Sequence, residues 1–137
     1  MERVMVERKL KLPLFLTRLS VFYFLFPWVL LRFNDVEKIQ NIASKHYYMD
    51  SFPNILNIAL GVFGMVSLFA FLIGIKKRLS YAAVFLIHAL GTVLVIPKMI
   101  LFTDKFVLIF LAAIPALGAM ALLYCLRDED TMLSLNK

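Results

Sequence analysis

Four long runs of apolar residues, separated by short polar or charged stretches, divide the chain. The runs cover residues 12–33, 53–75, 79–102 and 104–126. Each run is close to the roughly 20 residues that an α-helix needs to cross about 30 Å of hydrocarbon. The pattern therefore predicts an all-α fold, a polytopic membrane four-helix bundle, in which residues 1–137 form a single integral membrane domain.

The stretch between the first two runs has a different pattern. Asn34-Asp35 can cap a helix, and apolar residues then recur at helical spacing. These apolar positions are Val36, Ile39, Ile42, Ala43, His46 and Tyr47. Because the opposite face is polar, we expect a short amphipathic helix that lies on the membrane surface between spans one and two. Only Thr103, Asp104 and Lys105 connect spans three and four, which predicts a tight antiparallel hairpin.

The composition is that of a membrane protein. Apolar residues make up 62% of the chain, and the mean hydropathy is +0.85. A soluble domain of this size could not bury so much apolar surface, so we expect the excess to contact the lipid bilayer. The net charge of +6 lies mostly in flanks between the apolar runs, which argues against a nucleic-acid partner.

The positive charges also predict how the chain is oriented. An even number of spans places both termini on one side, together with the turn between spans two and three. That side holds Arg3, Arg8, Lys9, Lys11, Lys76, Lys77, Arg78, Arg127 and Lys137, against Arg32, Lys38, Lys45, Lys98 and Lys105 on the other. The imbalance predicts that both termini are cytoplasmic. We expect Arg18 and Lys98 to extend toward the interface, and the polar tail from Arg127 onward to be frayed.

His88 is the most conspicuous ionisable residue within the predicted spans. It lies near the middle of span three, and Gly91, Thr92 and Val95 follow on the same face of the helix. One interpretation makes His88 a proton carrier or a hydrogen-bond partner for a quinone; the other makes it an interhelical packing contact. A metal site is not expected, because the other histidine, His46, belongs to the surface helix.

Span two opens with a polar stripe formed by Asn54 and Asn57, which continues through Gly61 and Gly64. Small residues permit close contact between membrane helices, and amide side chains can hydrogen-bond across that contact. The candidate ligand-binding residues are therefore His88, Thr92, Asn54 and Asn57.

Signatures of catalysis are missing from the sequence. It contains no P-loop, GxSxG, HExxH or GxGxxG motif, and no pair of carboxylates falls within the spans. The lone Cys125 leaves no dithiol that could cycle between thiol and disulfide. The sequence therefore predicts no catalytic residues, and a protein that is not an enzyme.

A series of short motifs runs along residues 16–127. They are Arg18-Leu19-Ser20 in span one, an amphipathic segment, Pro53, Gly61 and Gly64 in span two, Leu72-Ile73-Gly74 at its end, and the basic turn Lys76-Lys77-Arg78. In this order they resemble the DoxX-like family of small bacterial membrane proteins. The chain departs from that family at Pro27 and Trp28, where members often carry Gly and Lys, so that Arg32 stands nearest the expected base. It also lacks the acidic residue that many members carry in span two.

The resemblance implies a non-catalytic subunit or anchor of an envelope redox or stress complex. It also implies a location in the bacterial inner membrane and a membrane or periplasmic redox protein as partner. Two alternatives stay open: a binding or redox protein for a lipophilic small molecule such as a quinone, and a small transporter. The scarcity of charge within the spans weighs against the transporter. A homo-oligomer is compatible with each of these functions.

Overall fold

The computed structural model describes residues 2–47, 49–101 and 107–135, and for residues 2–7, 98, 101 and 107 it describes the backbone alone. The connection predicted at Thr103, Asp104 and Lys105 and the side chain of Lys98 therefore lie outside the described residues.

The described residues form helices and connecting turns, with no strand among them. The helices are α1 (Glu2–Asn34), α2 (Val36–His46), α3 (Asn54–Leu72), α4 (Lys77–Leu101), α5 (Val107–Leu111) and α6 (Ala113–Cys125). Four segments are long and apolar enough to cross a membrane: Arg8–Asn34, Asn54–Leu72, Lys77–Pro97 and Leu108–Cys125. The predicted all-α fold with four candidate membrane spans is confirmed.

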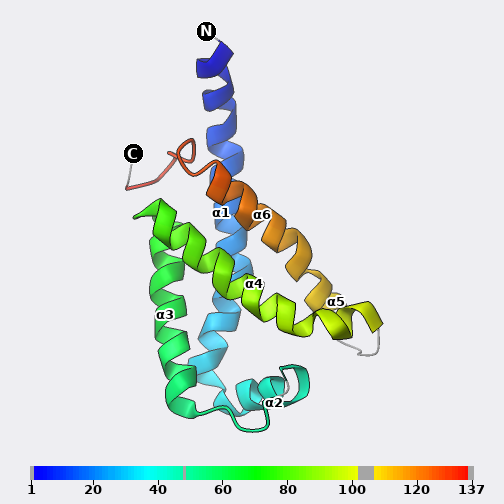
Figure 1. Ribbon diagram of the computed structural model, residues 1–137. Coiled ribbons are helices and arrows are strands. Elements are labelled where there is room, and N and C mark those ends of the chain that lie inside the picture. Colours follow the sequence, from blue (N-terminus) through cyan, green and yellow to red (C-terminus); the bar gives the residue numbers. More distant parts are fainter. Residues whose placement is uncertain (1, 48, 102–106, 136–137) are drawn as a thin grey trace.

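The helices are arranged so that α1 contacts α3 and α6, while α4 also contacts α3 and α6. In Figure 1 the N-terminus, the C-terminus and the turn between α3 and α4 lie toward one end of the molecule, and α2 lies at the opposite end. We call these the terminal end and the α2 end. This arrangement has the even number of crossings that the sequence predicted.

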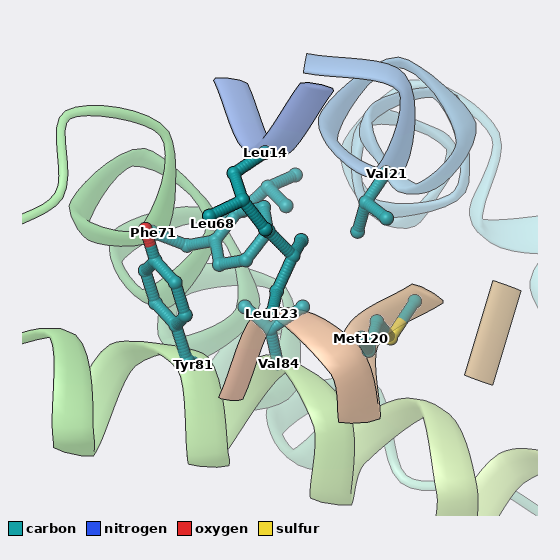
Figure 2. Packing of buried hydrophobic residues seen from close by; sticks show 8 residues of the cluster. All are labelled: Leu14, Val21, Leu68, Phe71, Tyr81, Val84, Met120 and Leu123. Carbon is teal, nitrogen blue, oxygen red and sulfur yellow. The ribbon is translucent and has the colours of Figure 1, made fainter. Parts of the chain in front are cut away.

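The main hydrophobic core lies toward the terminal end. Figure 2 shows its buried residues, which come from all four spans: Leu14, Val21, Leu68, Phe71, Tyr81, Val84, Met120 and Leu123. A second, smaller cluster of Ile39, Ala43 and Phe52 joins α2 to the loop before α3. Many large apolar side chains elsewhere are exposed, among them Tyr23, Ile55 and Leu108, as expected where a helix faces lipid.

The fourth predicted span is interrupted at Ala112, between α5 and α6. The cause is Pro115, which has no N–H to donate to the carbonyl of Leu111 and whose ring crowds that carbonyl. The backbone N–H of Ala112 still donates to the carbonyl of Leu108 at 3.3 Å. The segment therefore bends rather than ends, as a proline within a membrane helix allows.

The amphipathic helix α2 begins at the predicted cap. The side chain of Asp35 accepts a hydrogen bond from the backbone N–H of Lys38 at 2.9 Å. The side chain of Gln40 bonds both backbone groups of Phe52, donating to its carbonyl at 2.5 Å and accepting from its N–H at 3.3 Å. These bonds fix the loop before α3 against α2, and Ile39 is buried at the junction.

Gly61 of α3 leaves room for the ring of Phe33 of α1 where these two helices pack together. A Cβ atom built on Gly61 would lie 2.8 Å from Cζ of Phe33, a distance that side chains do not tolerate without moving. The predicted role of Gly61 as a site of close helix contact is therefore visible in the packing.

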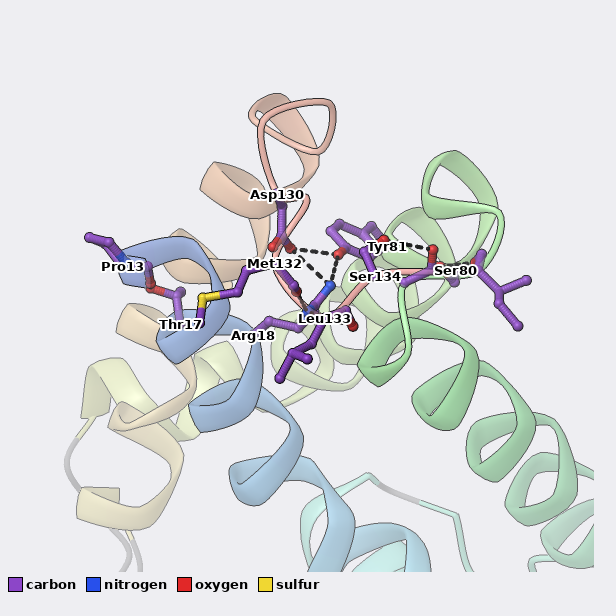
Figure 3. Close-up of polar contacts among 11 residues, drawn as sticks. Pro13, Thr17, Arg18, Ser80, Tyr81, Asp130, Met132, Leu133 and Ser134 are labelled. Atoms are coloured by element: carbon purple, nitrogen blue, oxygen red, sulfur yellow. Dashed lines mark hydrogen bonds and ion pairs between the residues drawn. The ribbon is translucent and has the colours of Figure 1, made fainter. Parts of the chain in front are cut away.

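The segment after α6 folds back onto the terminal end instead of fraying (Figure 3). Arg18 and Asp130 are both fully buried, with Nη1 of Arg18 3.4 Å from Oδ2 of Asp130. The hydroxyl of Tyr81 accepts from Nη1 of Arg18 at 3.3 Å and donates to Oδ2 of Asp130 at 2.7 Å. Nη2 of Arg18 donates to the backbone carbonyl of Met132 at 2.5 Å. The predictions that Arg18 extends outward and that the tail is frayed were wrong, because the tail supplies the carboxylate that Arg18 needs.

Gly74 allows the tail to reach this position. Its φ of +67° is in the left-handed region that favours glycine, and it begins the turn between α3 and α4. The hydroxyl of Ser134 donates to the carbonyl of Gly74 at 3.2 Å, and the backbone N–H of Leu135 donates to the carbonyl of Ile73 at 3.0 Å. A Cβ atom on Gly74 would collide with Ser134, so the turn and the docked tail both require glycine here.

The three basic residues that follow Gly74 differ in how far they are exposed. Lys76 and Arg78 are exposed. Lys77 is buried and interacts electrostatically with Asp130. The turn therefore contributes both surface charge and one cation beside the buried Arg18–Asp130 pair.

Candidate functional site

A cavity of about 410 Å³ lies between the main core and α2. Pockets that hold small molecules usually measure about 300–1,000 Å³ and are lined mainly by apolar side chains. The lining comes from α1, α2, α3, α4, α5 and α6 and from the loop after α2, and it is mostly apolar. The apolar and aromatic lining residues include Phe24, Leu25, Trp28, Val29, Ile39, Phe52, Phe63, Leu68, Val84, Val95, Phe110 and Ala113.

Four polar side chains reach this lining besides the indole of Trp28: Arg32, Tyr47, His88 and Thr92. No Asp or Glu is among the described residues that line the cavity. The cavity thus combines a largely apolar wall with a few hydrogen-bonding groups, which is typical of sites that bind lipophilic molecules in one orientation.

His88 is half-buried in α4 and lines the cavity. The ring of Phe24 meets it edge-on, with the centroids 5.5 Å apart and the planes at 90°. The imidazole also interacts with the backbone of Ala113, while its Nε2 is buried without a hydrogen-bond partner among the described residues. A buried polar atom of this kind is costly unless something bonds it, so His88 keeps one unused donor or acceptor just behind the cavity surface.

Thr92 lies one turn after His88, as predicted, but its hydroxyl is occupied. It donates to the backbone carbonyl of His88 at 2.8 Å, a bond within the same helix. The hydroxyl oxygen can still accept one bond from a ligand. Gly91 lines the cavity on the same stretch of α4, and a Cβ atom there would lie 3.6 Å from the hydroxyl of Tyr47.

The two asparagines of the predicted polar stripe have different positions. Asn57 is fully buried and exchanges two hydrogen bonds with Arg32: Nη1 of Arg32 donates to Oδ1 of Asn57, and Nδ2 of Asn57 donates to the carbonyl of Arg32, both at 3.0 Å. Asn54 is exposed and does not line the cavity. Asn57 therefore positions a cavity residue, and Asn54 faces the surroundings.

Arg32 and Tyr47 are cavity residues that the sequence did not indicate as a site. The sequence placed Arg32 among the charges that flank the spans, and Tyr47 in the apolar series of the surface helix. Burial raises the pKa of the Tyr47 hydroxyl above its usual value, and the nearby Arg32 guanidinium partly opposes this rise. Tyr47 therefore stays protonated at neutral pH and can donate a hydrogen bond. Arg32 and Tyr47 both lie close to the membrane surface at the end of span one, and this shared level is the sequence signal that could have identified them.

The side chains of the described residues contain no cluster of three His, Cys, Asp or Glu that could hold a metal ion. Cys125 is exposed and unpaired with another cysteine, at the end of α6 and outside the cavity lining. The arrangement brings groups that could orient a molecule, namely Arg32, Tyr47 and His88, to the wall of a largely apolar, partly open cavity.

Comparison of the chain with protein-family models, with curated proteins and with solved structures finds no match. The DoxX-like resemblance, and the role as subunit or anchor that it implies, therefore stay predictions from the sequence.

Proposed function

We propose that the protein binds a lipophilic small molecule with a polar head, a quinone being one such molecule, in the cavity beside His88. One observation carries the proposal: a largely apolar cavity of about 410 Å³ is lined by the half-buried His88, whose Nε2 has no hydrogen-bond partner among the described residues. Apolar walls bind the body of such a molecule, while a small number of polar groups fix its orientation.

A packing role alone does not explain why the Nε2 atom of His88 has no partner among the described residues. A histidine retained only for packing would complete its hydrogen bonds with neighbouring helices, because an unpaired buried polar atom costs about 1–3 kcal/mol. In the described residues the Nε2 atom of His88 has no such bond. A ligand oxygen would provide one once the imidazole turns toward the cavity that His88 lines.

His88→Leu is expected to weaken quinone binding about tenfold, because one hydrogen bond contributes about 0.5–1.5 kcal/mol. The same change should lower the free energy of unfolding by no more than about 0.5–1.5 kcal/mol, since it removes the single bond to the backbone of Ala113 together with a buried atom that has no partner. The saturable part of the quenching of Trp28, the single tryptophan and a partly exposed cavity residue, reports binding. Detergent-solubilised protein is titrated with a decyl-substituted quinone, which quenches indole emission, and melting curves are recorded in parallel.

The control for this titration is Leu86→Ile, an apolar substitution at an exposed residue of α4 outside the cavity lining. It should leave the affinity for the quinone within about twofold of the original. Equal affinities for the original protein and His88→Leu would count against a role of His88 in binding.

We also propose that the protein resides in the bacterial inner membrane with both termini in the cytoplasm. The excess of Lys and Arg near the terminal end supports this orientation. With Cys125 replaced by Ser, a single cysteine is introduced at Asp128 or at Asn41, both of which are exposed. A membrane-impermeant maleimide should label Asn41→Cys in intact cells, and Asp128→Cys only after the membrane is opened. The reverse pattern would refute the orientation.

A further inference from the structure

Arg32 lines the cavity, and no carboxylate of the described residues balances its charge. Among the described residues the ion pairs join Arg18 to Asp130 and Arg127 to Asp128, and none includes Arg32. Its side-chain hydrogen bond goes to the neutral amide of Asn57. Its titratable neighbour is Tyr47, whose hydroxyl is also uncharged at neutral pH. Arg32 is thus a half-buried cation that meets only neutral partners.

We infer that the cavity binds a single-chain amphiphile whose head is an oxyanion, a carboxylate or a phosphate, held by Arg32 and Tyr47. This inference rests on the proposed function and specifies the class of its ligand. A guanidinium presents five N–H groups in a planar fork that matches two oxygens of a carboxylate or phosphate. The bond of Arg32 to Asn57 uses one of these groups and fixes the side chain, and the Tyr47 hydroxyl supplies a further donor.

The position of Arg32 along α1 suits an anionic head. It lies two residues before the end of that helix at Asn34, so the head would sit near the level of the lipid head groups. Phe24, which packs against His88, lies eight residues earlier in α1, or about 12 Å along the helix axis. The apolar wall between these two levels would enclose the hydrocarbon chain. A neutral quinone head would leave the charge of Arg32 unbalanced.

The test compares two ligands with the same hydrocarbon chain, dibrominated hexadecanoic acid and its uncharged methyl ester. The bromine atoms quench Trp28 as either ligand enters the cavity. The titration is done at pH 8 with full-length protein in nanodiscs of phosphatidylcholine. The acid is expected to bind at least about tenfold more tightly than the ester, as a charge-assisted bond of about 1.5–3 kcal/mol implies.

Arg32→Gln is expected to abolish this preference for the acid, whereas Arg78→Gln, at an exposed arginine of the terminal end, should retain it. Melting curves establish that each variant is folded. If Arg32→Gln does not fold, Arg32→Lys replaces it and should keep a reduced preference, because the charge remains but the fork is lost. An unchanged preference in Arg32→Gln, or none in folded Arg32→Lys, would overturn the inference.

Competition experiments identify the source of the oxyanion. Hexadecyl phosphate should displace the brominated acid, and millimolar inorganic phosphate should not. Displacement by inorganic phosphate would mean that Arg32 binds a free anion, and loss of the preference in nanodiscs that contain phosphatidylglycerol would mean that bilayer lipids occupy the site. Either result would overturn the inference of a dedicated amphiphile.

The inference and the proposed function fail in different ways. If the acid and the ester bind equally, and cavity-filling Gly91→Leu prevents both from binding, the inference is wrong and the proposed function stands. If neither ligand nor the decyl quinone gives saturable quenching, the proposed function itself is wrong.

Discussion

Asp130→Ala is expected to lower the free energy of unfolding by about 3–5 kcal/mol, the usual effect of removing one partner from a buried ion pair. Asp130 and Arg18 are fully buried, so the variant would leave the guanidinium without a counter-charge. It would also remove the acceptor to which Tyr81 donates at 2.7 Å. Chemical unfolding in detergent, followed by circular dichroism, measures the loss.

The matched control is Asp128→Ala, two residues earlier in the same segment. The side chain of Asp128 is 81% exposed and lies 4.0 Å from Nη2 of Arg127, an arrangement that contributes little to stability. Limited proteolysis adds a local readout, because loss of the Arg18 contact should expose the segment after α6 to cleavage. Equal stability of the Asp130→Ala and Asp128→Ala variants would contradict the docked tail.

Asn57→Leu is expected to lower the free energy of unfolding by about 1–3 kcal/mol. Asn57 is fully buried, and both of its hydrogen bonds go to Arg32 at 3.0 Å. Leucine has a similar size but leaves the Arg32 carbonyl and one guanidinium N–H without their partners. Unfolding in detergent gives the stability, and the Trp28 titration shows whether the acid still binds when Arg32 is no longer fixed.

Asn54→Leu is the control, since Asn54 lies three residues earlier in α3 and is exposed. We expect its stability to stay within about 0.5 kcal/mol of the original. If Asn54→Leu and Asn57→Leu lost the same stability, the bonds between Asn57 and Arg32 would have no measurable role.

Much of the fold follows from local pattern. The long apolar runs predicted the four spans, and the spacing of Ile39 and Ala43 predicted the amphipathic helix α2, whose cap at Asp35 is formed as expected. Such features depend on residues within a few turns of one another, so one sequence is enough to find them. The ends of the helices differ from the ends of the apolar runs. The helix α1 begins at Glu2 rather than near residue 12, and the fourth span is interrupted ahead of Pro115.

Long-range contacts could not be predicted in the same way. Arg18 and Asp130 lie more than a hundred residues apart, and the tail around Asp130 has no periodic apolar pattern that would indicate burial. An arginine near the end of an isolated helix would extend to water, and only the returning tail makes burial favourable.

The candidate site was predicted in part. His88 and Thr92 were selected because polar residues within a membrane span are uncommon, and both line the cavity. In the sequence, Arg32 is one of several positive charges that flank the spans. Its hydrogen bond to Asn57 joins two helices and cannot be read from the sequence. Tyr47 reaches the cavity only because α2 folds back toward α4.

Filling the cavity tests the central claim most directly. Gly91→Leu places a side chain in the cavity, and its Cβ would meet only the Tyr47 hydroxyl at an ordinary distance of 3.6 Å. The measurement is the saturable quenching of Trp28 by the decyl quinone, in the original protein and in the folded variant. We predict that the original protein saturates and that Gly91→Leu loses the saturable component. Identical saturation curves for the two proteins would contradict binding in this cavity.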